Sequence, residues 1–174
     1  QERPEAIPLS FAQQRLWFLD QLLPNQALYN IPMALRLKGH LDVDALEKAL
    51  CYLTERHEIL RTHIESESGE AYQVISPQTS FRLERIDFSN LCSEEREEAS
   101  HNIIEEEALK PFHLEKGPLI RGKLLLLAEG EAIFLLSMHH IVSDGWSFDI
   151  FLRELKSAYE AYKKGETPGL SALS

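Results

Sequence analysis

Hydrophobic residues recur along the chain with two different periods, and together these periods predict alternating helices and strands. Apolar residues three or four positions apart predict helices that begin near Ser10, Asp42, Ser93 and Ser147. Ser10 and Gln13 have the spacing of a capping box, which strengthens the first of these starts. In that first helix the predicted buried stripe consists of Ala12, Leu16, Leu19 and Leu23.

Strands are predicted where the period changes to two or where the sequence becomes continuously apolar. Alternation predicts a strand over 31–38, and Gly69 marks a hairpin turn toward 72–75. The continuous apolar runs 124–127 and 133–136 predict an antiparallel hairpin in the middle of a sheet, with both faces covered. The order of elements favours an α+β two-layer sandwich, in which helices pack on a mixed, largely antiparallel sheet.

Length, composition and charge favour a single globular domain that binds neither nucleic acid nor anionic membranes. The chain has 174 residues, of which 44% are hydrophobic and 26% charged, and its formal net charge is −10. The apolar runs are shorter than a membrane span and the first residues do not resemble a signal peptide, so we expect a cytoplasmic protein. Cys51 and Cys92 lack metal-ligand spacing, and we expect both to be reduced and at least half-buried.

Two adjacent histidines follow the second apolar run and form the strongest candidate for chemistry. Because side chains alternate along a strand, His139 and His140 should point to opposite faces, one into the protein and one into a cleft. An imidazole with a pKa of roughly 6.5 is suited to proton transfer near neutrality. Gly145 allows backbone to approach a ligand, and free N–H groups at the turn and helix start can stabilise an oxyanion.

Less specific interpretations of the same residues stay open on the pattern alone. A histidine at a strand end is more often a structural residue than a catalytic one. A metal site has less support, because neighbouring strand residues diverge and no third ligand lies nearby at motif spacing. Asp144 has the position of a helix cap or of a partner for an arginine, as often as that of a catalytic acid.

Three ordered motifs make the chain similar to the condensation domains of nonribosomal peptide synthetases. Residues 139–145, HHIVSDG, resemble the HHxxxDG signature of that family. Residues 10–19, SFAQQRLWFL, resemble its opening SxAQxRLWxL motif, and residues 56–62, RHEILRT, resemble its RHExLRT motif. The resemblance extends along nearly the whole chain.

This resemblance implies a role for each residue of the motif. His140 would be the catalytic histidine, which positions or deprotonates the acceptor amine or stabilises the tetrahedral species, and Gly145 would present backbone to the thioester. His139 would be supporting. Asp144 would hold the loop through an arginine, for which Arg61 is the candidate. Trp146, after the glycine, disfavours an epimerisation domain and favours a condensation domain that accepts an L-configured donor.

The resemblance also implies a reaction and its partners. Amide bond formation would join two acyl groups, each bound as a thioester to the phosphopantetheine arm of a peptidyl carrier protein. We expect no directly bound cofactor and no metal. The expected partners are the donor and acceptor carrier proteins, the C-terminal condensation subdomain and an adjacent adenylation domain.

Family members have two related halves that resemble chloramphenicol acetyltransferase, with the active site in a channel between them. Residues 1–174 are therefore expected to form a single N-terminal subdomain, with 1–9 as a lead-in and 165–174 as the start of a linker. A subdomain with one wall of the channel is expected to be inactive alone.

Two other functions remain compatible with the sequence. One is a stand-alone HxxxDG acyltransferase that acts on a soluble acceptor, for which a stable trimer would be evidence. The other is a non-catalytic module for docking carrier proteins, against which the intact motif argues.

Overall fold

The structure, a computed structural model, describes residues 7–24, 26–143 and 145–170. Its helices are α1 (Phe11–Leu22), α2 (Val43–Arg56), α3 (Ser93–Leu109) and α4 (Gly145–Lys163), with a short 3₁₀ helix at Glu58–Arg61. Its strands are β1 (Ile7–Pro8), β2 (Asn30–Lys38), β3 (Thr62–Glu67), β4 (Glu70–Ile75), β5 (Leu83–Asp87), β6 (Ile120–Ala128) and β7 (Glu131–His139).

The strands form two sheets, and the larger one is mixed and largely antiparallel as predicted. Its strand order is β2-β7-β6-β5, with only β5 and β6 parallel among its pairs. The smaller sheet has the order β1-β4-β3 and is antiparallel. The predicted apolar hairpin is β6–β7, and it occupies the centre of the larger sheet. The α+β class with a mixed, largely antiparallel sheet is therefore confirmed, whereas the expected two layers become three because helices lie on both faces of that sheet.

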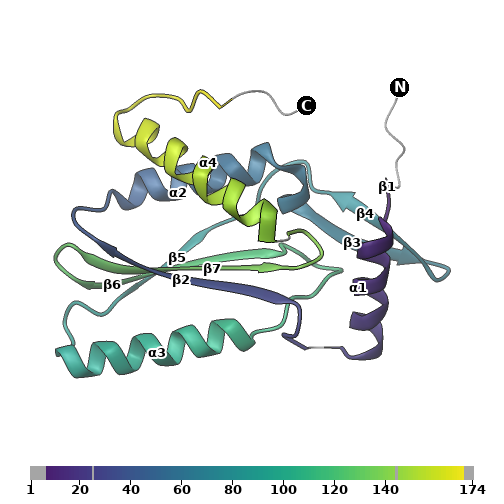
Figure 1. Cartoon of the computed structure of the whole chain (residues 1–174), viewed down its shortest axis with the longest axis horizontal. Helices are drawn as coiled ribbons and strands as arrows, with labels where there is room; N and C mark the ends of the chain where they lie inside the picture. The colour runs from purple at the N-terminus through teal and green to yellow at the C-terminus, as the bar shows by residue number, and fades with distance from the viewer. Residues whose placement is uncertain (1–6, 25, 144, 171–174) are drawn as a thin grey trace.

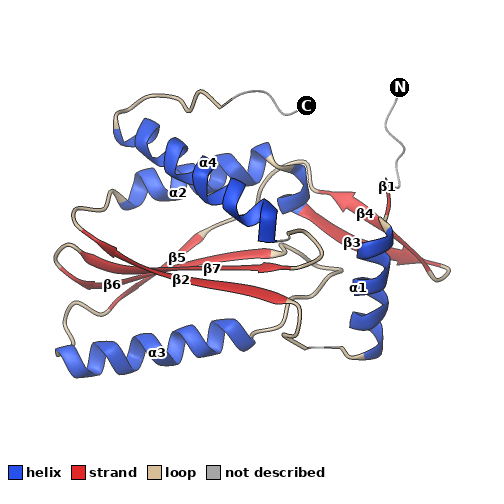
Figure 2. Ribbon diagram, viewed as in Figure 1, coloured by secondary structure: helices blue, strands red, loops and turns tan. Residues whose placement is uncertain are grey.

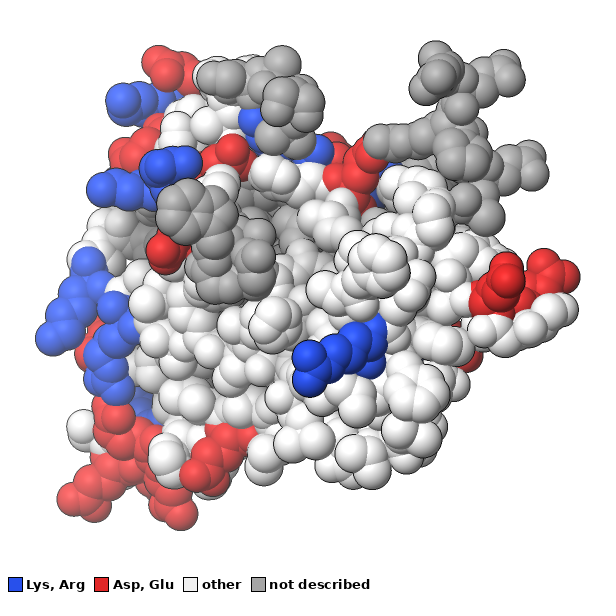
Figure 3. Space-filling view, turned by 45° about the vertical axis from the view of Figure 1, so that its right-hand side comes forward, with Lys and Arg blue, Asp and Glu red and all other residues white. Residues whose placement is uncertain are grey.

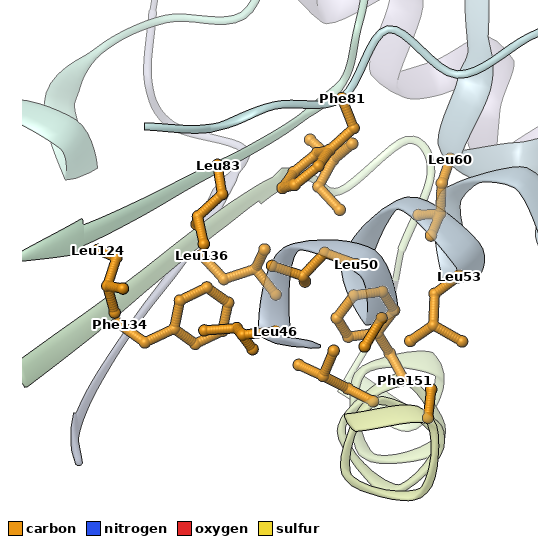
Figure 4. Close-up of a cluster of buried hydrophobic side chains, with 14 of the residues drawn as sticks. Leu46, Leu50, Leu53, Leu60, Phe81, Leu83, Leu124, Phe134, Leu136 and Phe151 are labelled. Atoms are coloured by element: carbon orange, nitrogen blue, oxygen red, sulfur yellow. The ribbon is translucent and has the colours of Figure 1, made fainter. Parts of the chain in front are cut away.

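Helices cover both faces of the larger sheet (Figures 1 and 2). On one face α2 and α4 pack together against β6 and β7, and the side chains of this core are shown in Figure 4. On the other face α3 brings Ile103 and Ile104 against the remaining side chains of the hairpin, which include Ile133 and Leu135. Because β7 is buried on both faces, its alternating side chains enter two separate cores.

Helix α1 begins as the sequence predicts but does not bury the predicted stripe. The Ser10 side chain accepts a hydrogen bond from the Gln13 backbone, and the Gln13 side chain accepts one from the Ser10 backbone. Leu16 and Leu19 are half-buried, whereas Ala12 and Leu23 are exposed. The prediction of a buried stripe was therefore wrong for these two residues, because α1 lies on the small sheet at the edge of the molecule (Figure 1).

The expectation that both cysteines are at least half-buried is confirmed for one of them and wrong for the other. Cys51 is half-buried but Cys92 is exposed, because Cys92 is the residue that precedes α3 and caps it. Part of the predicted lead-in, Ile7–Pro8, pairs with β4 as strand β1. Within the described ranges, no helix combines the length and the apolar character that a membrane span requires.

Candidate active site

The histidine pair lies where β7 leaves the larger sheet, beside α1 and the small sheet (Figure 1). His139 is 3% exposed, while His140 is exposed. The backbone N–H of His139 donates to the Leu119 carbonyl at 3.0 Å, and that of His140 donates to the Tyr29 carbonyl at 2.8 Å. The predicted alternation is confirmed: one histidine is enclosed by the protein and the other faces solvent.

His139 is held as a neutral imidazole in an aromatic environment. Its ring centroid lies 6.2 Å from that of Tyr29 and 6.1 Å from that of Phe112. Its Nδ1 accepts the backbone N–H of Ile141 at 3.1 Å, so the proton of the neutral ring is on Nε2. Burial lowers the pKa of His139 to about 4, and the neighbouring His140 acts in the same direction. This residue therefore shapes the turn and does not exchange protons near neutrality.

His140 faces an open groove of about 680 Å³ between the motif and α1. Helix α1 contributes Gln13, whose side-chain amide donates to the carbonyl of Ile141 and to the side chain of Gln73, both at 3.2 Å. Other residues that line the groove are Ser10, Ala12, Arg15, Leu16, Leu19, Tyr29, Ile59, Val142 and Ser143. The groove is large enough for an extended acyl or aminoacyl group to reach the imidazole.

Gln13 is the residue that connects the opening motif to the histidine motif. Its side chain caps α1 and also bonds the turn that follows His140, 128 positions along the chain. The sequence predicted only the capping role, because the second contact depends on how α1 is placed in three dimensions. Gln73 lies in no chemically recognisable pattern, and the structure brings it to the groove together with Tyr29.

The RHEILRT motif at residues 56–62 lies at the end of α2 and makes contacts with neighbouring elements. His57 Nε2 lies 2.6 Å from a carboxylate oxygen of Glu154 in α4, and Arg56 Nε lies 3.5 Å from the same oxygen. Arg61 donates to the backbone carbonyl of Ser76 and lies 3.6 Å from the Glu58 carboxylate. Arg56 and His57 therefore join the end of α2 to α4, and Arg61 joins the 3₁₀ helix to the residue that follows β4.

Three of the predicted motif residues lie at or next to a gap in the described ranges. Asp144 is outside the described residues, so its pairing with Arg61 stays a prediction. Gly145 is the first residue of α4, where the leading N–H groups of a helix have no intrahelical partner. The side chain of Trp146 is also outside the described part. In the ranges that the structure describes, no three His, Cys, Asp or Glu side chains form a group able to hold a metal ion.

The buried histidine, the exposed histidine in the groove and the helix start at Gly145 all lie within the HHIVSDG motif at residues 139–145. The family model for the condensation domain matches residues 4–174. The chain belongs to the condensation domain family.

Relatives of this condensation-domain chain are much longer peptide synthetases. The chain is 52% identical over 171 residues to a linear gramicidin synthase subunit of Brevibacillus parabrevis, a match that covers 98% of the chain and 2% of the synthase subunit. It is 41% identical over 171 residues to malpinin synthetase of Mortierella alpina, which covers 98% of the chain and 2% of that synthetase. The chain thus spans a small fraction of the length of its curated relatives.

Solved structures show the same fold. The X-domain in its complex with OxyB from teicoplanin biosynthesis has a TM-score of 0.88 and 33% identity, over 99% of this chain and 36% of that one. The first condensation domain of the CDA synthetase has a TM-score of 0.86 and 26% identity, over 97% of this chain and 43% of that one. The predicted likeness to condensation domains is therefore confirmed.

Proposed function

We propose that these residues carry the catalytic histidine of a condensation domain that forms an amide bond between two carrier-bound thioesters. The observation that carries this proposal is the exposure of His140 in the groove, within the HHxxxDG motif and with its neighbour His139 buried. Because solved relatives are more than twice as long as the match, the reaction is proposed for the complete domain.

The proposed reaction needs a weak base and correct placement of the two reactants. The amine of the acceptor attacks the thioester carbonyl of the donor, the C–N bond forms, the C–S bond breaks and the donor carrier leaves as a thiol. An aminoacyl ammonium has a pKa of roughly 8, so an appreciable minority is already neutral at pH 7. His140 then orients this amine and receives its proton, which passes to the leaving thiolate, and the groove holds the two reactants together.

A soluble acceptor and a purely docking role are the competing proposals. The teicoplanin X-domain forms a complex with OxyB, so a chain of this fold also binds a partner protein. Against a docking role alone, this chain keeps both histidines and buries only one of them.

We propose a donor of L configuration, which rests on the sequence Trp146-Ser147 after the glycine.

The outer face of α1 is proposed as a carrier-protein docking surface at the rim of the groove. Phe11, Phe18 and Leu22 lie on this face with exposed fractions of 92%, 58% and 60%, and Leu23 and Leu28 are also exposed. Figure 3 shows that the face of the molecule that carries α1 is largely uncharged. Exposed apolar patches commonly mark protein interfaces, and α1 also supplies residues that line the groove.

Replacing Phe18 by serine should weaken carrier binding by about tenfold, since an aromatic anchor commonly contributes that much to an interface. The measurement is fluorescence anisotropy of a labelled carrier, loaded with a non-hydrolysable amide analogue, against the complete domain. Leu109→Ser is the matched control, because Leu109 is 73% exposed at the end of α3 and is not among the described residues that line the groove. Equal affinities for Phe18→Ser and the parent would remove α1 from the docking surface.

A further inference from the structure

A buried ion pair joins α3 to β6, close to the end of β7 that carries the histidines. Glu107 is 4% exposed, and its Oε1 accepts a hydrogen bond from Arg121 Nε at 2.5 Å. Its other oxygen lies 3.6 Å from Lys123 Nζ, which also reaches Glu84 at 2.8 Å. Burial of such a pair costs solvation, and apolar replacements are often as stable, so stability alone does not account for it.

The guanidinium of Arg121 also binds the segment that connects α3 to β6. Its Nη1 donates to the Pro111 carbonyl at 3.1 Å, and its Nη2 donates to the Lys110 carbonyl at 2.7 Å. Its centre lies 3.7 Å from the centroid of the Phe112 ring. One planar group thus binds a carboxylate, two carbonyls and an aromatic face, which a lysine cannot reproduce.

The same segment is attached to the strand that pairs with β7. The Asn30 side chain donates to the Ala108 carbonyl at 3.1 Å and to the Lys110 carbonyl at 2.8 Å. Asn30 lies directly opposite His139 in the β2–β7 register. The Lys110 carbonyl therefore receives hydrogen bonds from two sides, and the position of Phe112 is fixed relative to both β6 and β2.

Phe112 connects this segment to the active-site turn, because its ring packs against the His139 ring. Its ring is 5% exposed and meets the His139 ring edge-on, with centroids 6.1 Å apart and planes at 85°. His139 in turn accepts the N–H of Ile141. His140 lies between these two residues, so the orientation of its side chain depends on the turn that the His139 ring holds.

We propose that Arg121 is a positioning residue for His140, which acts through Phe112 and the His139 ring. Arg121 is not among the described residues that line the groove, so we assign it no contact with the reactants. This inference rests on the proposed condensation reaction for its kinetic consequence, but its structural consequence is independent of any activity.

The test compares Arg121→Lys with Lys123→Met. Arg121→Lys keeps the positive charge beside Glu107 and loses the two carbonyl contacts and the ring contact. Lys123→Met removes the other cation near Glu107 and leaves the Phe112 segment intact. Phe112→Leu is a second variant, which keeps an apolar side chain and removes the ring that both Arg121 and His139 contact.

The first measurement follows the His139 ring by NMR during a pH titration of the 174-residue chain. In Arg121→Lys and in Phe112→Leu, looser packing should admit water and move the pKa of His139 upward by about one unit, toward its ordinary value. Lys123→Met should titrate like the parent. If Arg121→Lys does not fold, Phe112→Leu decides the outcome.

The second measurement is single-turnover condensation by the complete domain. Arg121→Lys and Phe112→Leu should lower the rate at saturating carriers by about 10-fold to 100-fold, the effect of misplacing a reacting group, with carrier affinity unchanged. Parent-like His139 titration in both variants would overturn the proposal, as would equal changes in Lys123→Met. An inactive parent domain would refute the proposed function, while the titration would still decide the role of Arg121.

Discussion

Replacing His140 by alanine should lower the rate of amide formation by the complete domain by about 10²- to 10⁴-fold, the usual contribution of a positioned acid–base group. His140 is exposed in the groove, and under the proposed function its loss removes the group that orients the amine and accepts its proton. The measurement is single-turnover product formation with both carriers saturating, followed by mass spectrometry of the acceptor carrier.

The matched control is His101→Ala on α3. The His101 side chain is 70% exposed, pairs with Glu105 on the same helix and is not among the described residues that line the groove. This variant should react at the parent rate. A His140→Ala domain that forms product at the parent rate would show that the exposed histidine has no part in the reaction.

Replacing His139 by alanine should destabilise the chain by about 2–4 kcal/mol, as for other large side chains removed from a core. The ring fills the space between Tyr29 and Phe112, and the Ile141 N–H loses its acceptor. His140→Ala should change the free energy of unfolding by less than about 0.5 kcal/mol, since the side chain is exposed. Urea unfolding at pH 7 measures both, and the reverse order would contradict the assigned roles.

The same residue should make folding sensitive to acid. Because the pKa of His139 is lowered from 6.5 to about 4 in the folded chain, the unfolded chain binds one more proton between these pH values. The contribution of neutral His139 to the free energy of unfolding is therefore fully present above pH 6.5. It falls by roughly 3 kcal/mol as the pH is lowered to 4. In His139→Gln this part of the slope should vanish, and a slope equal to that of the parent would refute the assignment.

The elements around the motif were predictable because their signals are local. Two continuous apolar runs separated by a short turn predict a central hairpin, and strand alternation then separates His139 from His140. The capping box of α1 likewise depends on two residues of one turn. Such features follow from backbone geometry, and the fold adds only their placement.

Which face of α1 is buried could not be predicted from the same kind of local pattern. Apolar spacing shows that a helix is amphipathic, but it does not show which apolar residues another element covers. In the structure the polar Gln13 turns toward the site, while Phe11 and Phe18 are exposed. On a helix, apolar residues that bind a partner protein have the same spacing as apolar residues that pack in a core.

The residues that hold the His139 ring could not be predicted from the sequence either. Phe112 and Arg121 belong to a connecting segment and a strand that show no chemical pattern of their own. The contact of Phe112 with His139, and that of Arg121 with Phe112, depend on the pairing of β6 with β7 and on the two hydrogen bonds that Asn30 donates. Contacts between distant segments of this kind come from the tertiary structure alone.

The most direct test of the central claim supplies the complete domain with a donor carrier loaded as an acyl thioester and an acceptor carrier loaded as an aminoacyl thioester. The proposed function predicts that the amide product appears on the acceptor carrier, that the donor carrier is released as a free thiol, and that both changes are lost in His140→Ala. Transfer of the acyl group only to a soluble amine, with the aminoacyl carrier left unchanged, would contradict it.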